Sequence, residues 1–503
     1  MEHVQAQAPV PVAFLEACCQ SLAEAEFRQR LHEHLDDLLD ELEARMSEKA
    51  EQRKEQGERG KEQRSHPGLE QLTQEILALR QELTGRIAEE WIKHNYQELL
   101  HQKTATCPGC GRTLSARGPH RRTVETLVGK ISLERPYFYC VDCQAGFYPL
   151  DEELELSSHC KQADMQRAAA SLAAEVPYET ASQLFNELTG LSLSDHLTHE
   201  LVGELTEGLT VLDVSPSAEE IAQRVAEVAE RRRWRPIVVL AIDGADVPTR
   251  PEEAKGRRPG RKRERAKRAH WQGEWREAKG FRFYLVEGER IVHLLSWHQV
   301  NSDEELALAL RQVKEAGLIP EEQVRLCVIA DGAKWIWKQV NALFPSAVQI
   351  LDYYHCSEHL HQVATVQFGD DPEKRTEWVE ATVTRLFLGE VEGVIDDLQH
   401  LQARDEQAAE EIRKLIGYLR NNHGRLDYGF ARKGGYPIGS GGIESANKFI
   451  SHVRLKRSGA WWYVEQANGM LALRCAKYNG TFDRVFERYK RRARPRRRPG
   501  RSP

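Results

Sequence analysis

Apolar positions recur with two different periods along this 503-residue chain, and the period changes near residue 235. Before that point they return at three- and four-residue steps, most clearly over 31–42 and 69–87, which predicts two amphipathic helices. Almost nothing apolar lies between them over 47–67. Two interpretations stay open: a helical hairpin with a solvated linker, or a coiled-coil arm that joins two chains.

The next two regions differ in pattern. Residues 101–150 contain alternating segments such as KISLERPYFYC together with the motifs CPGC and CVDC, and they predict a small β-rich module. Residues 151–232 return to helical periodicity. Within them, residues 178–202 have the rhythm of a helix-turn-helix with Gly190 at the turn, although helical hairpins share that rhythm.

From Arg235 onward, short apolar runs alternate with helical stretches. The runs predict three strands in series, then a helix, a strand, a helix and a strand, followed by an almost wholly helical stretch. This order is that of an α/β catalytic core of the ribonuclease H-like type. The predicted strands are 237–243, 281–286, 290–297, 323–330 and 347–352, the helices are about 303–316 and 334–344, and the helical insertion is about 357–435.

Three carboxylates stand at notable places in this pattern. Asp243 and Asp331 each close an apolar run, and Glu444 lies at the start of a predicted helix after a glycine-rich segment. Metal-assisted attack on phosphorus needs hard oxygen ligands for two cations, so the three predict a catalytic site with two Mg²⁺ ions. The simpler alternative is that each Asp-Gly is an ordinary turn. Asp246 and Asp352 are competitors, the first assigned to a loop and the second to the neighbourhood of the site.

The cysteines form two close pairs, Cys107 with Cys110 and Cys140 with Cys143. Each CxxC makes a tight turn that points two thiolates at one ion, and two such turns complete a tetrahedral zinc site. Four thiolates leave no open position, so the predicted Zn²⁺ is structural. Redox chemistry is the alternative, but the module lacks the βαβ context of thioredoxin-like proteins.

Positive charge is concentrated although the net charge is −6. The segments 255–268 and 488–501 are strongly basic, which is typical of a protein that binds a polyanion. More basic residues follow Glu444, and a tryptophan among them could stack on an unpaired base, although such residues are more often core. The predicted DNA contacts are Arg257, Arg258, Arg261, Lys262, Arg263, Lys448, Arg454, Lys456, Arg457 and Trp461.

Four separated segments together resemble DDE transposases of the ISKra insertion-sequence group, which are related to Mutator-like transposases. The segments are AIDGADVP, VIADGAKWIW, ILDYYHCSEHL, and GSGGIESANK followed by RSGAWWYVEQANGMLALR, within about residues 100–485. The resemblance implies a catalytic triad of Asp243, Asp331 and Glu444 that cleaves element ends and transfers strands into target DNA. It also implies double-stranded DNA as partner and a homodimer or higher oligomer.

Mutator-like relatives carry a Cys-x-x-His signature, and this chain offers two pairs near that position. These are Asp352 with His355, and Cys356 with His359. The resemblance does not decide which pair corresponds to the signature. From the residues alone, packing and capping at a helix start is favoured for His355, Cys356 and His359 over metal binding.

Length and composition set the remaining expectations. No apolar run is long enough to span a bilayer and the amino terminus lacks signal-peptide features, so we expect a cytoplasmic, nucleoid-associated protein without membrane contact. A ribonuclease H-like endonuclease without strand transfer and an inactive DNA-binding regulator are the alternatives to a transposase. The expected regions are a helical arm at 1–100, a zinc ribbon-like module at 101–150, a helical region at 151–232, a catalytic domain at 233–485 and a basic tail at 486–503.

Overall fold

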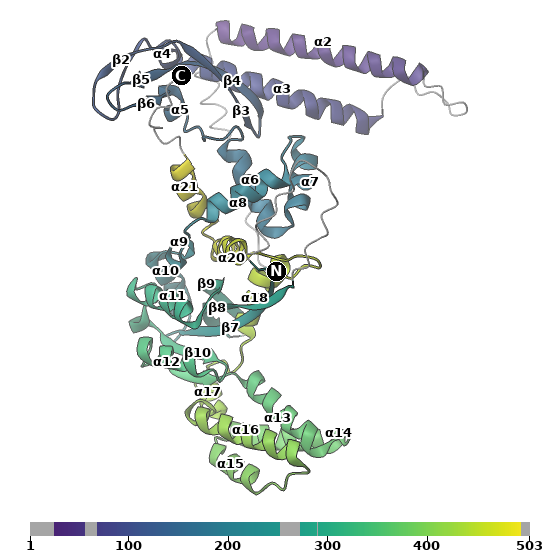
Figure 1. Ribbon diagram of the computed structural model, residues 1–503, viewed down its shortest axis with the longest axis vertical. Coiled ribbons are helices and arrows are strands. Elements are labelled where there is room, and N and C mark those ends of the chain that lie inside the picture. The colour runs from purple at the N-terminus through teal and green to yellow at the C-terminus, as the bar shows by residue number, and fades with distance from the viewer. Residues whose placement is uncertain (1–24, 56–67, 252–271, 289, 494–503) are drawn as a thin grey trace. The chain divides into compact units, whose positions relative to one another are not determined.

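The structure is a computed structural model that describes residues 25–55, 68–251, 272–288 and 290–493 (Figure 1). It is a mixed α/β protein with two compact units. Unit 1 holds the described residues up to Ala173, then Tyr178–His199 and those from Arg488 onward. Unit 2 holds Ala174–Pro177 and Glu200–Glu487. The helical region expected at 151–232 is therefore shared between the units.

Unit 1 begins with two long helices, α2 (Ala25–Glu55) and α3 (Leu69–Asn95). They run antiparallel, because Arg30 pairs with Glu90 at 3.1 Å whereas Arg45, further along α2, reaches Glu82 at 3.8 Å. The described residues thus form a hairpin within one chain, and a dimeric arm stays a prediction. Helix α2 also extends into the segment that was expected to be a linker.

The cysteine module follows as three two-stranded antiparallel sheets, which pair β1 with β2, β3 with β4 and β5 with β6. Helix α3 packs on β4, and both contribute to one apolar core with Ile92, Leu133 and Leu150. The arm and the module therefore share a core instead of forming separate regions. The elements are α4 (Gln97–Leu100), β1 (Thr104–Thr106), β2 (Thr113–Ser115), β3 (Pro119–Thr126), β4 (Gly129–Pro136), β5 (Phe138–Cys140), β6 (Ala145–Phe147) and α5 (Pro149–Glu153).

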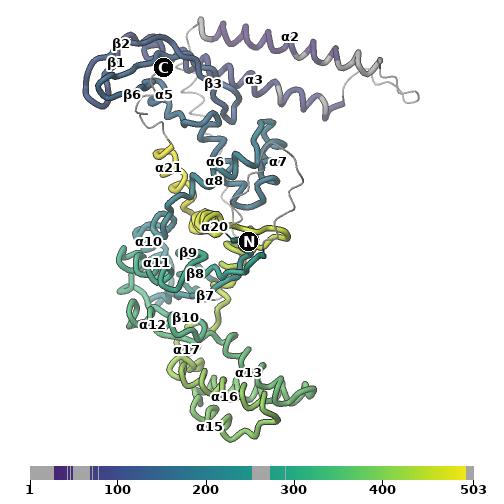
Figure 2. The backbone as a smooth tube through the Cα atoms, viewed as in Figure 1, coloured from purple at the N-terminus to yellow at the C-terminus, as the bar shows by residue number. Residues whose placement is uncertain are grey.

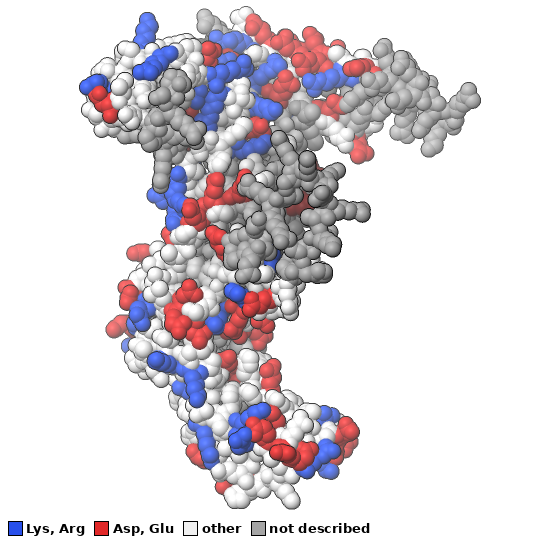
Figure 3. All heavy atoms as spheres, viewed as in Figure 1, with Lys and Arg blue, Asp and Glu red and all other residues white. Residues whose placement is uncertain are grey.

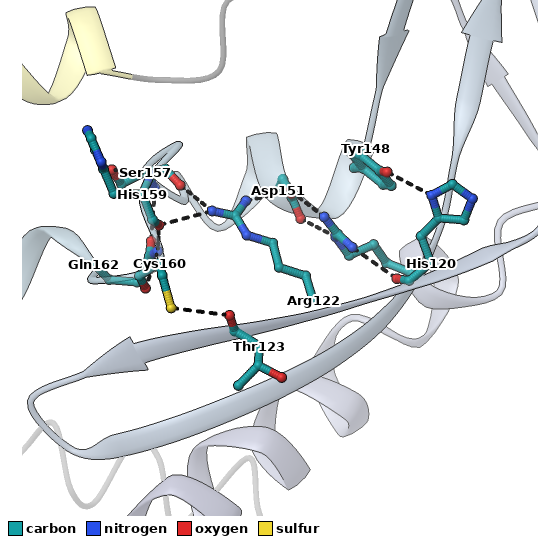
Figure 4. Close-up of polar contacts among 10 residues, drawn as sticks. His120, Arg122, Thr123, Tyr148, Asp151, Ser157, His159, Cys160 and Gln162 are labelled. Carbon is teal, nitrogen blue, oxygen red and sulfur yellow. Dashed lines mark hydrogen bonds and ion pairs between the residues drawn. The ribbon is translucent and has the colours of Figure 1, made fainter. Parts of the chain in front are cut away.

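A buried ion network fixes α5 to the β3–β4 hairpin (Figure 4). Asp151 accepts from Arg135 Nη2 and from Arg122 Nη1, each at 2.8 Å. Asp151 and Arg135 are both buried. Arg135 also donates to the His120 carbonyl and lies 3.9 Å from the centre of the Tyr148 ring. Because both guanidinium groups meet one carboxylate, Asp151 compensates one of the two positive charges, and Arg122 is the more exposed of the two arginines.

Two helices lie where the sequence predicted a helix-turn-helix rhythm. Helix α7 spans Tyr178–Thr189 and α8 spans Asp195–Thr206, and Gly190 between them has a φ of 72°. That left-handed conformation is the one expected of a glycine directly after a helix. The turn is therefore confirmed, whereas DNA reading by α8 stays a prediction. Helix α6 (Ala163–Glu175) precedes this pair.

Unit 2 is built on one five-stranded mixed sheet in the order β11-β10-β7-β8-β9. Strands β7, β8 and β9 are antiparallel neighbours, whereas β10 is parallel to β7 and β11 is parallel to β10. Each strand contains one of the apolar runs seen in the sequence, and β7 and β8 extend well beyond theirs. They are β7 (Ile237–Thr249), β8 (Glu274–Glu287), β9 (Arg290–Val300), β10 (Arg325–Ala330) and β11 (Val348–Leu351).

Strand β7 is longer than its apolar run predicted. Parallel pairing with β10 stops at Ala241, but pairing with β8 continues to Thr249. The backbone beyond Asp243 still pairs with β8, so the strand does not end there. At its far end Pro248, which has no N–H to donate, accepts a hydrogen bond from the Trp462 N–H at 3.1 Å. Asp246 is therefore a strand residue opposite Glu277, not a loop residue.

Helices surround the sheet and extend beyond β11. Helix α11 connects β9 to β10 and α12 connects β10 to β11, and the chain then runs through a helical insertion before returning to α18 (Figure 2). The bounds are α9 (Val211–Val214), α10 (Ala218–Ala229), α11 (Asp303–Glu315), η2 (Glu321–Gln323), α12 (Lys334–Leu343), α13 (Tyr353–Phe368), α14 (Pro372–Phe387), α15 (Val391–His400), α16 (Glu406–Asn422), η3 (His423–Arg425), α17 (Tyr428–Lys433), α18 (Gly441–Asn447), η4 (Lys448–His452), α19 (Val453–Leu455), α20 (Val464–Asn479) and α21 (Phe482–Ala493).

The helical insertion carries charges of both signs on its surface (Figure 3). Arg385 pairs with Glu390 at 3.0 Å, and Lys414 pairs with Glu411 at 2.7 Å. Such mixed, exposed pairs are typical of a solvated helical surface and contribute little stability each. The insertion therefore does not show the concentrated positive charge of the two basic segments.

Candidate functional site

Three aspartates form one row across the carboxyl ends of the parallel strands. The last β7–β10 pair joins Ala241 to Ile329, and Asp243 and Asp331 each lie two residues beyond it. The last β10–β11 pair joins Ala330 to Leu351, and Asp331 and Asp352 directly follow it. The Asp331 and Asp352 charges both raise the pKa of Asp243, so the three carboxylates lie near one another. Asp331 is therefore flanked by Asp243 and Asp352.

Asp243 is held in a partly buried position beside the other two. Burial raises the pKa of Asp243 to about 6, although the Gly244 backbone N–H and the His355 ring act in the opposite direction. Asp331 and Asp352 raise that pKa further. The carboxylate of Asp243 thus lacks full compensation by the protein, as expected of a group that gains from a bound cation.

Asp331 and Asp352 are fixed by the helices that follow them. Asp331 Oδ1 accepts from the Ala333 N–H at 2.9 Å, directly before α12. Asp352 caps α13 by accepting from the Tyr354 N–H at 3.2 Å. Asp352 is fully buried, and its Oδ2 has no hydrogen-bond donor. His355 Nε2 lies 3.8 Å from that oxygen.

Glu444 reaches the row through α18. Ser440, the residue before α18, donates its backbone N–H to Asp352 Oδ1 at 3.0 Å and its hydroxyl to Glu444 Oε1 at 3.0 Å. One serine thus connects the buried aspartate to the exposed glutamate. The other end of α18 is tied to the row as well, since Asn447 donates its side-chain N–H to Asp243 Oδ2 at 2.9 Å. Glu444 and Asn447 are three residues apart and lie on one face of the helix.

Buried polar side chains on strands β8 and β9 donate hydrogen bonds to residues of α18. Arg282 on β8 donates to the Gly442 carbonyl and, at 3.0 Å, to Ser445 Oγ. His298 on β9 lies 2.8 Å from Asn447 Oδ1 through its Nε2, which must be the donor because the amide oxygen accepts. Burial lowers the pKa of His298 to about 4, so the ring is neutral at pH 7.

A π-helix, η4 (Lys448–His452), follows α18 directly. Arg474 on α20 is fully buried and donates to the Phe449 and Ile450 carbonyls. A π-turn leaves the α-helical hydrogen-bond pattern, and π-turns occur often at functional sites. Arg474 therefore stabilises the irregular backbone next to the carboxylates.

The three predicted catalytic residues are thus brought to one side of the sheet, but they do not form a compact ligand group. Within the described part of the chain, one group of His, Cys, Asp or Glu has all its ligand atoms within 4.8 Å of one another, and it consists of the four cysteines. Asp246, by contrast, is exposed. It lies three residues after Asp243 on β7, so its side chain points to the opposite face of the strand.

The four cysteines lie at the tips of two hairpins. Cys107 and Cys110 connect β1 to β2, and Cys140 and Cys143 connect β5 to β6. Cys107 Sγ lies 3.8 Å from Cys143 Sγ, and Cys110 Sγ lies 3.6 Å from Cys140 Sγ. Four sulfurs around one zinc at about 2.3 Å would be about 3.8 Å apart. The cluster therefore has the donors and the spacing to hold a metal ion such as zinc.

The thiols of this cluster cannot all ionise by themselves. The backbone N–H groups of Cys110 and Gly109 lower the pKa of Cys107 to about 6, whereas the neighbouring Cys110 and Cys107 raise the pKa of Cys143 to about 12. The residue after each CxxC is left-handed, with φ 75° at Gly111 and 48° at Gln144. Both turns thus have the same local form, as expected for two halves of one metal site.

Cys356 and His359, the second pair near the signature position, pack against neighbouring residues. Cys356 is buried, and burial raises the pKa of its thiol to about 11. The His359 ring lies 4.3 Å from the Tyr418 ring, and burial lowers its pKa. These contacts favour packing within α13 and α16 over metal binding, as the residue types alone had suggested.

The predicted DNA contacts have different outcomes. Lys448 and Arg457 are exposed and Lys456 is half-buried, so their positive charges reach the surface. Arg454 does not, since it is 3% exposed and lies 4.9 Å from the centre of the Trp462 ring. The guanidinium of Arg454 packs on an aromatic ring in the core, which does not favour the DNA contact predicted for it. Residues outside the described part of the chain are Arg257, Arg258, Arg261, Lys262 and Arg263.

Trp461 is half-buried and packs edge to face with Trp275, with ring centres 6.3 Å apart. The pair leaves Trp275 58% exposed. An exposed aromatic pair of this kind is compatible with base stacking, which stays a prediction. Among the described helices, none is long and apolar enough to cross a membrane.

The structure also adds residues that were not singled out from the sequence. Ser440 and Asn447 lie four residues before and three residues after Glu444, so helical spacing could have indicated both. Asp352 was placed beside the site, and the register brings it into the row. Arg282 and His298 are separated from Glu444 by more than a hundred residues, and only the sheet order relates them.

The chain thus carries a row of carboxylates on the mixed sheet of unit 2 and a four-cysteine cluster in unit 1. The chain belongs to an uncharacterised protein family, UPF0236, whose sequence model matches residues 112–492. That match covers the cysteine pair at 140 and 143, all of the sheet and α18. A search among curated proteins finds no match.

Proposed function

We propose that this protein is a DNA transposase of the DDE type, which cleaves DNA strands at the ends of an insertion sequence and transfers them to target DNA. The observation that carries the proposal is the row of Asp243, Asp331 and Asp352 with Glu444 fastened beside it through Ser440 and Asn447. Asp352 is buried, and burial raises the pKa of the partly buried Asp243, so grouping these carboxylates is costly without a cation.

The sheet supports a ribonuclease H-like catalytic core. The first three strands are antiparallel neighbours, and the fourth and fifth add on the other side of the first in parallel orientation. This is the strand order expected of that fold. Helix α18, which follows the helical insertion, packs on β7 and β8 and supplies Glu444.

Two Mg²⁺ ions would be held by Asp243, Asp331 and Glu444, and when bound they supply an activated oxygen nucleophile and neutralise the leaving oxygen. The residues fit hard cations, because all three are carboxylates and the pKa of Asp243 is raised by burial and by the neighbouring aspartates. Ser440 and Asn447 orient Glu444 and Asp243. His355 Nε2 lies 3.8 Å from Asp352 Oδ2, so a change in charge at the row would act on the His355 ring.

The cysteine cluster would hold one structural Zn²⁺. All four ligands are thiols, so no position remains for a substrate, and the ion would fix the two hairpins to each other. Positively charged residues near α18, such as Lys448 and Arg457, would contact phosphates of double-stranded DNA. A homodimer or higher oligomer is part of the proposal, since two element ends must be handled together.

The proposal is tested with the full chain, Mg²⁺ and DNA that carries its own gene with both flanks. Nicks and joined products are mapped by sequencing. A transposase gives metal-dependent cleavage at the flanks followed by joining to target DNA. Cleavage without joined products favours the endonuclease, and binding to the flanks without cleavage favours the regulator.

A matched pair of variants assigns the activity to the row. Asp331→Asn should abolish cleavage, because it removes the central carboxylate without changing its size. Asp246→Asn changes an exposed aspartate three residues from Asp243 on the same strand and should leave cleavage unchanged. Cleavage that survives Asp331→Asn, or that is lost equally in both variants, would contradict the proposed site.

A further inference from the structure

A pocket of about 580 Å³ lies in unit 2 beside the carboxylate row. It is bordered by β8, the turn before β9, the start of α13, the end of α14 and the segment that leads into α18. Its walls are mainly aromatic. The aromatic lining residues are Tyr284, Tyr353, Tyr354, Phe387 and Tyr436.

The pocket and the row share two short backbone segments. Tyr353 and Tyr354 directly follow Asp352, and the Tyr353 N–H donates to the Ile438 carbonyl at 2.9 Å. On the opposite side, Gly441 and Gly442 line the pocket within the turn of α18 that carries Glu444. The pocket therefore adjoins the two segments that carry Asp352 and Glu444.

The charge of the pocket suits an anion. Arg290 and Arg432 line it and both are exposed, and among the lining residues that the structure describes none is acidic. The Arg432 guanidinium lies 5.7 Å from the centre of the Phe387 ring, so cation and aromatic face lie together. Aromatic faces beside guanidinium groups form the usual surface for a base and its phosphate.

Glycines let the rings lie directly against the backbone. A Cβ at Gly439 would be 2.6 Å from the Tyr354 ring, and one at Gly442 would be 2.5 Å from the Tyr284 ring. Tyr354 is nevertheless 56% exposed, so burial in a core does not explain its placement. The ring is held by its contacts with Gly439 and Tyr353, and the part that stays exposed is accessible to a ligand.

We propose that this pocket binds one unstacked nucleotide of a DNA strand, with its base against Tyr354 and Tyr436 and its phosphate at Arg290 and Arg432. The inference rests on the proposed function for its ligand, since it assumes that DNA reaches the row. Binding at the pocket itself requires neither metal nor cleavage, so the two proposals can fail separately.

The test measures binding of a short fluorescein-labelled oligothymidylate to the full chain by fluorescence anisotropy in magnesium-free buffer. All proteins carry Asp331→Asn, so no strand is cut. A strand of equal length without bases serves as the second probe, because it has the same phosphates. The strand with bases should bind about ten-fold more tightly, as expected for stacking of one base on aromatic rings.

Variants locate the effect. Tyr354→Ala and Tyr436→Ala should remove most of the preference for the strand with bases, and Arg432→Ala should weaken both probes. Phe430→Ala is the aromatic control. Phe430 lies two residues before Arg432 on α17, is 59% exposed and is not among the residues that line the pocket. Lys433→Ala is the control for charge.

Three outcomes overturn the pocket proposal: equal affinity for both probes, no binding of either probe, or a loss in Phe430→Ala as large as that in Tyr354→Ala. Each is independent of catalysis. If cleavage fails but the base preference depends on Tyr354, the pocket stands and the transposase proposal falls. If cleavage occurs without a base preference, the reverse holds.

Discussion

Asn447 joins the row of carboxylates to the opposite edge of the sheet, because it donates to Asp243 Oδ2 at 2.9 Å and accepts from His298 Nε2 at 2.8 Å. Asn447 and His298 are both buried. One amide thus satisfies a partly buried carboxylate on β7 and a fully buried imidazole on β9, and it fixes the orientation of α18 between them.

Removing that amide should destabilise unit 2 and misplace Glu444. We expect Asn447→Ala to lower the free energy of unfolding by about 1–3 kcal/mol, because it leaves buried polar groups without partners. Urea denaturation followed by tryptophan fluorescence measures the change. Lys448→Ala, at the next and exposed position, is the control. Equal midpoints for wild type and Asn447→Ala would show that the amide is not needed.

The buried His298 should make the protein sensitive to acid. Burial lowers its pKa to about 4, and its Nδ1 has no hydrogen-bond partner, so the folded state binds its proton less readily than the unfolded state, whose pKa is 6.5. The stabilising effect of the neutral ring is complete above pH 6.5 and is lost as the pH falls towards 4. By pH 5 this amounts to about 2 kcal/mol.

The free energy of unfolding is compared between wild type and variants at each pH, because Asp243 changes stability with pH in the opposite direction to His298. Its raised pKa of about 6 gives stability that is present at low pH and lost as the pH rises from about 4 to 6. In His298→Gln the acid-dependent part from His298 should disappear, since the amide can still donate to Asn447. His361→Gln, at an exposed position, should follow wild type. An unchanged pH slope in His298→Gln would contradict the assignment.

Zinc should be bound with a stoichiometry of about one ion per chain, as one tetrahedral four-cysteine site requires. Elemental analysis of the purified protein measures it. Cys143→Ser should lose most of the zinc and lower the melting temperature of unit 1, whereas Cys160→Ser, a cysteine outside the cluster, should keep both. Chelation of wild type should reproduce the effect of Cys143→Ser. Full zinc content in Cys143→Ser would exclude this site.

The buried Asp151 should be needed for the fold of unit 1. Asp151→Ala leaves Arg122 and Arg135 without their shared carboxylate, and we expect a loss of about 3–5 kcal/mol. Glu152→Ala, at the adjacent exposed position on α5, should change stability little. Limited proteolysis and thermal unfolding report on unit 1. A small effect of Asp151→Ala would mean that solvent reaches the two arginines.

Much of the sheet could be predicted because its strands are buried and apolar. The short apolar runs around Val238 and Val328 are typical of strands buried on both faces. Their order in the chain therefore indicated the alternation of strands and helices. The cysteine pairs were also informative, since CxxC spacing dictates where thiols point. What the pattern did not predict was the length of β7, because pairing with β8 and not hydrophobicity decides where that strand ends.

The site was predicted less completely, for a physical reason. Hydrogen bonds across the fold depend on register, and register is not visible in a single strand. Asp352 enters the row because Ala330 pairs with Leu351, and Arg454 leaves the set of surface charges because its helix turns it toward Trp462. Both outcomes depend on packing between segments that are distant in sequence.

The π-helix after α18 has a consequence for how the sequence can vary. A π-turn contains one residue more than an α-turn, so losing a single residue from 448–452 would restore a regular helix. Glu444 and Asn447 would stay in place, and Lys456 and Arg457 would keep about the same direction, because the longer turn and the shorter one close between the same flanking residues. The shortened turn would no longer present the carbonyls of Phe449 and Ile450 to Arg474 as it does now. Among related chains, a deletion within 448–452 is therefore expected together with a replacement of the buried arginine at 474.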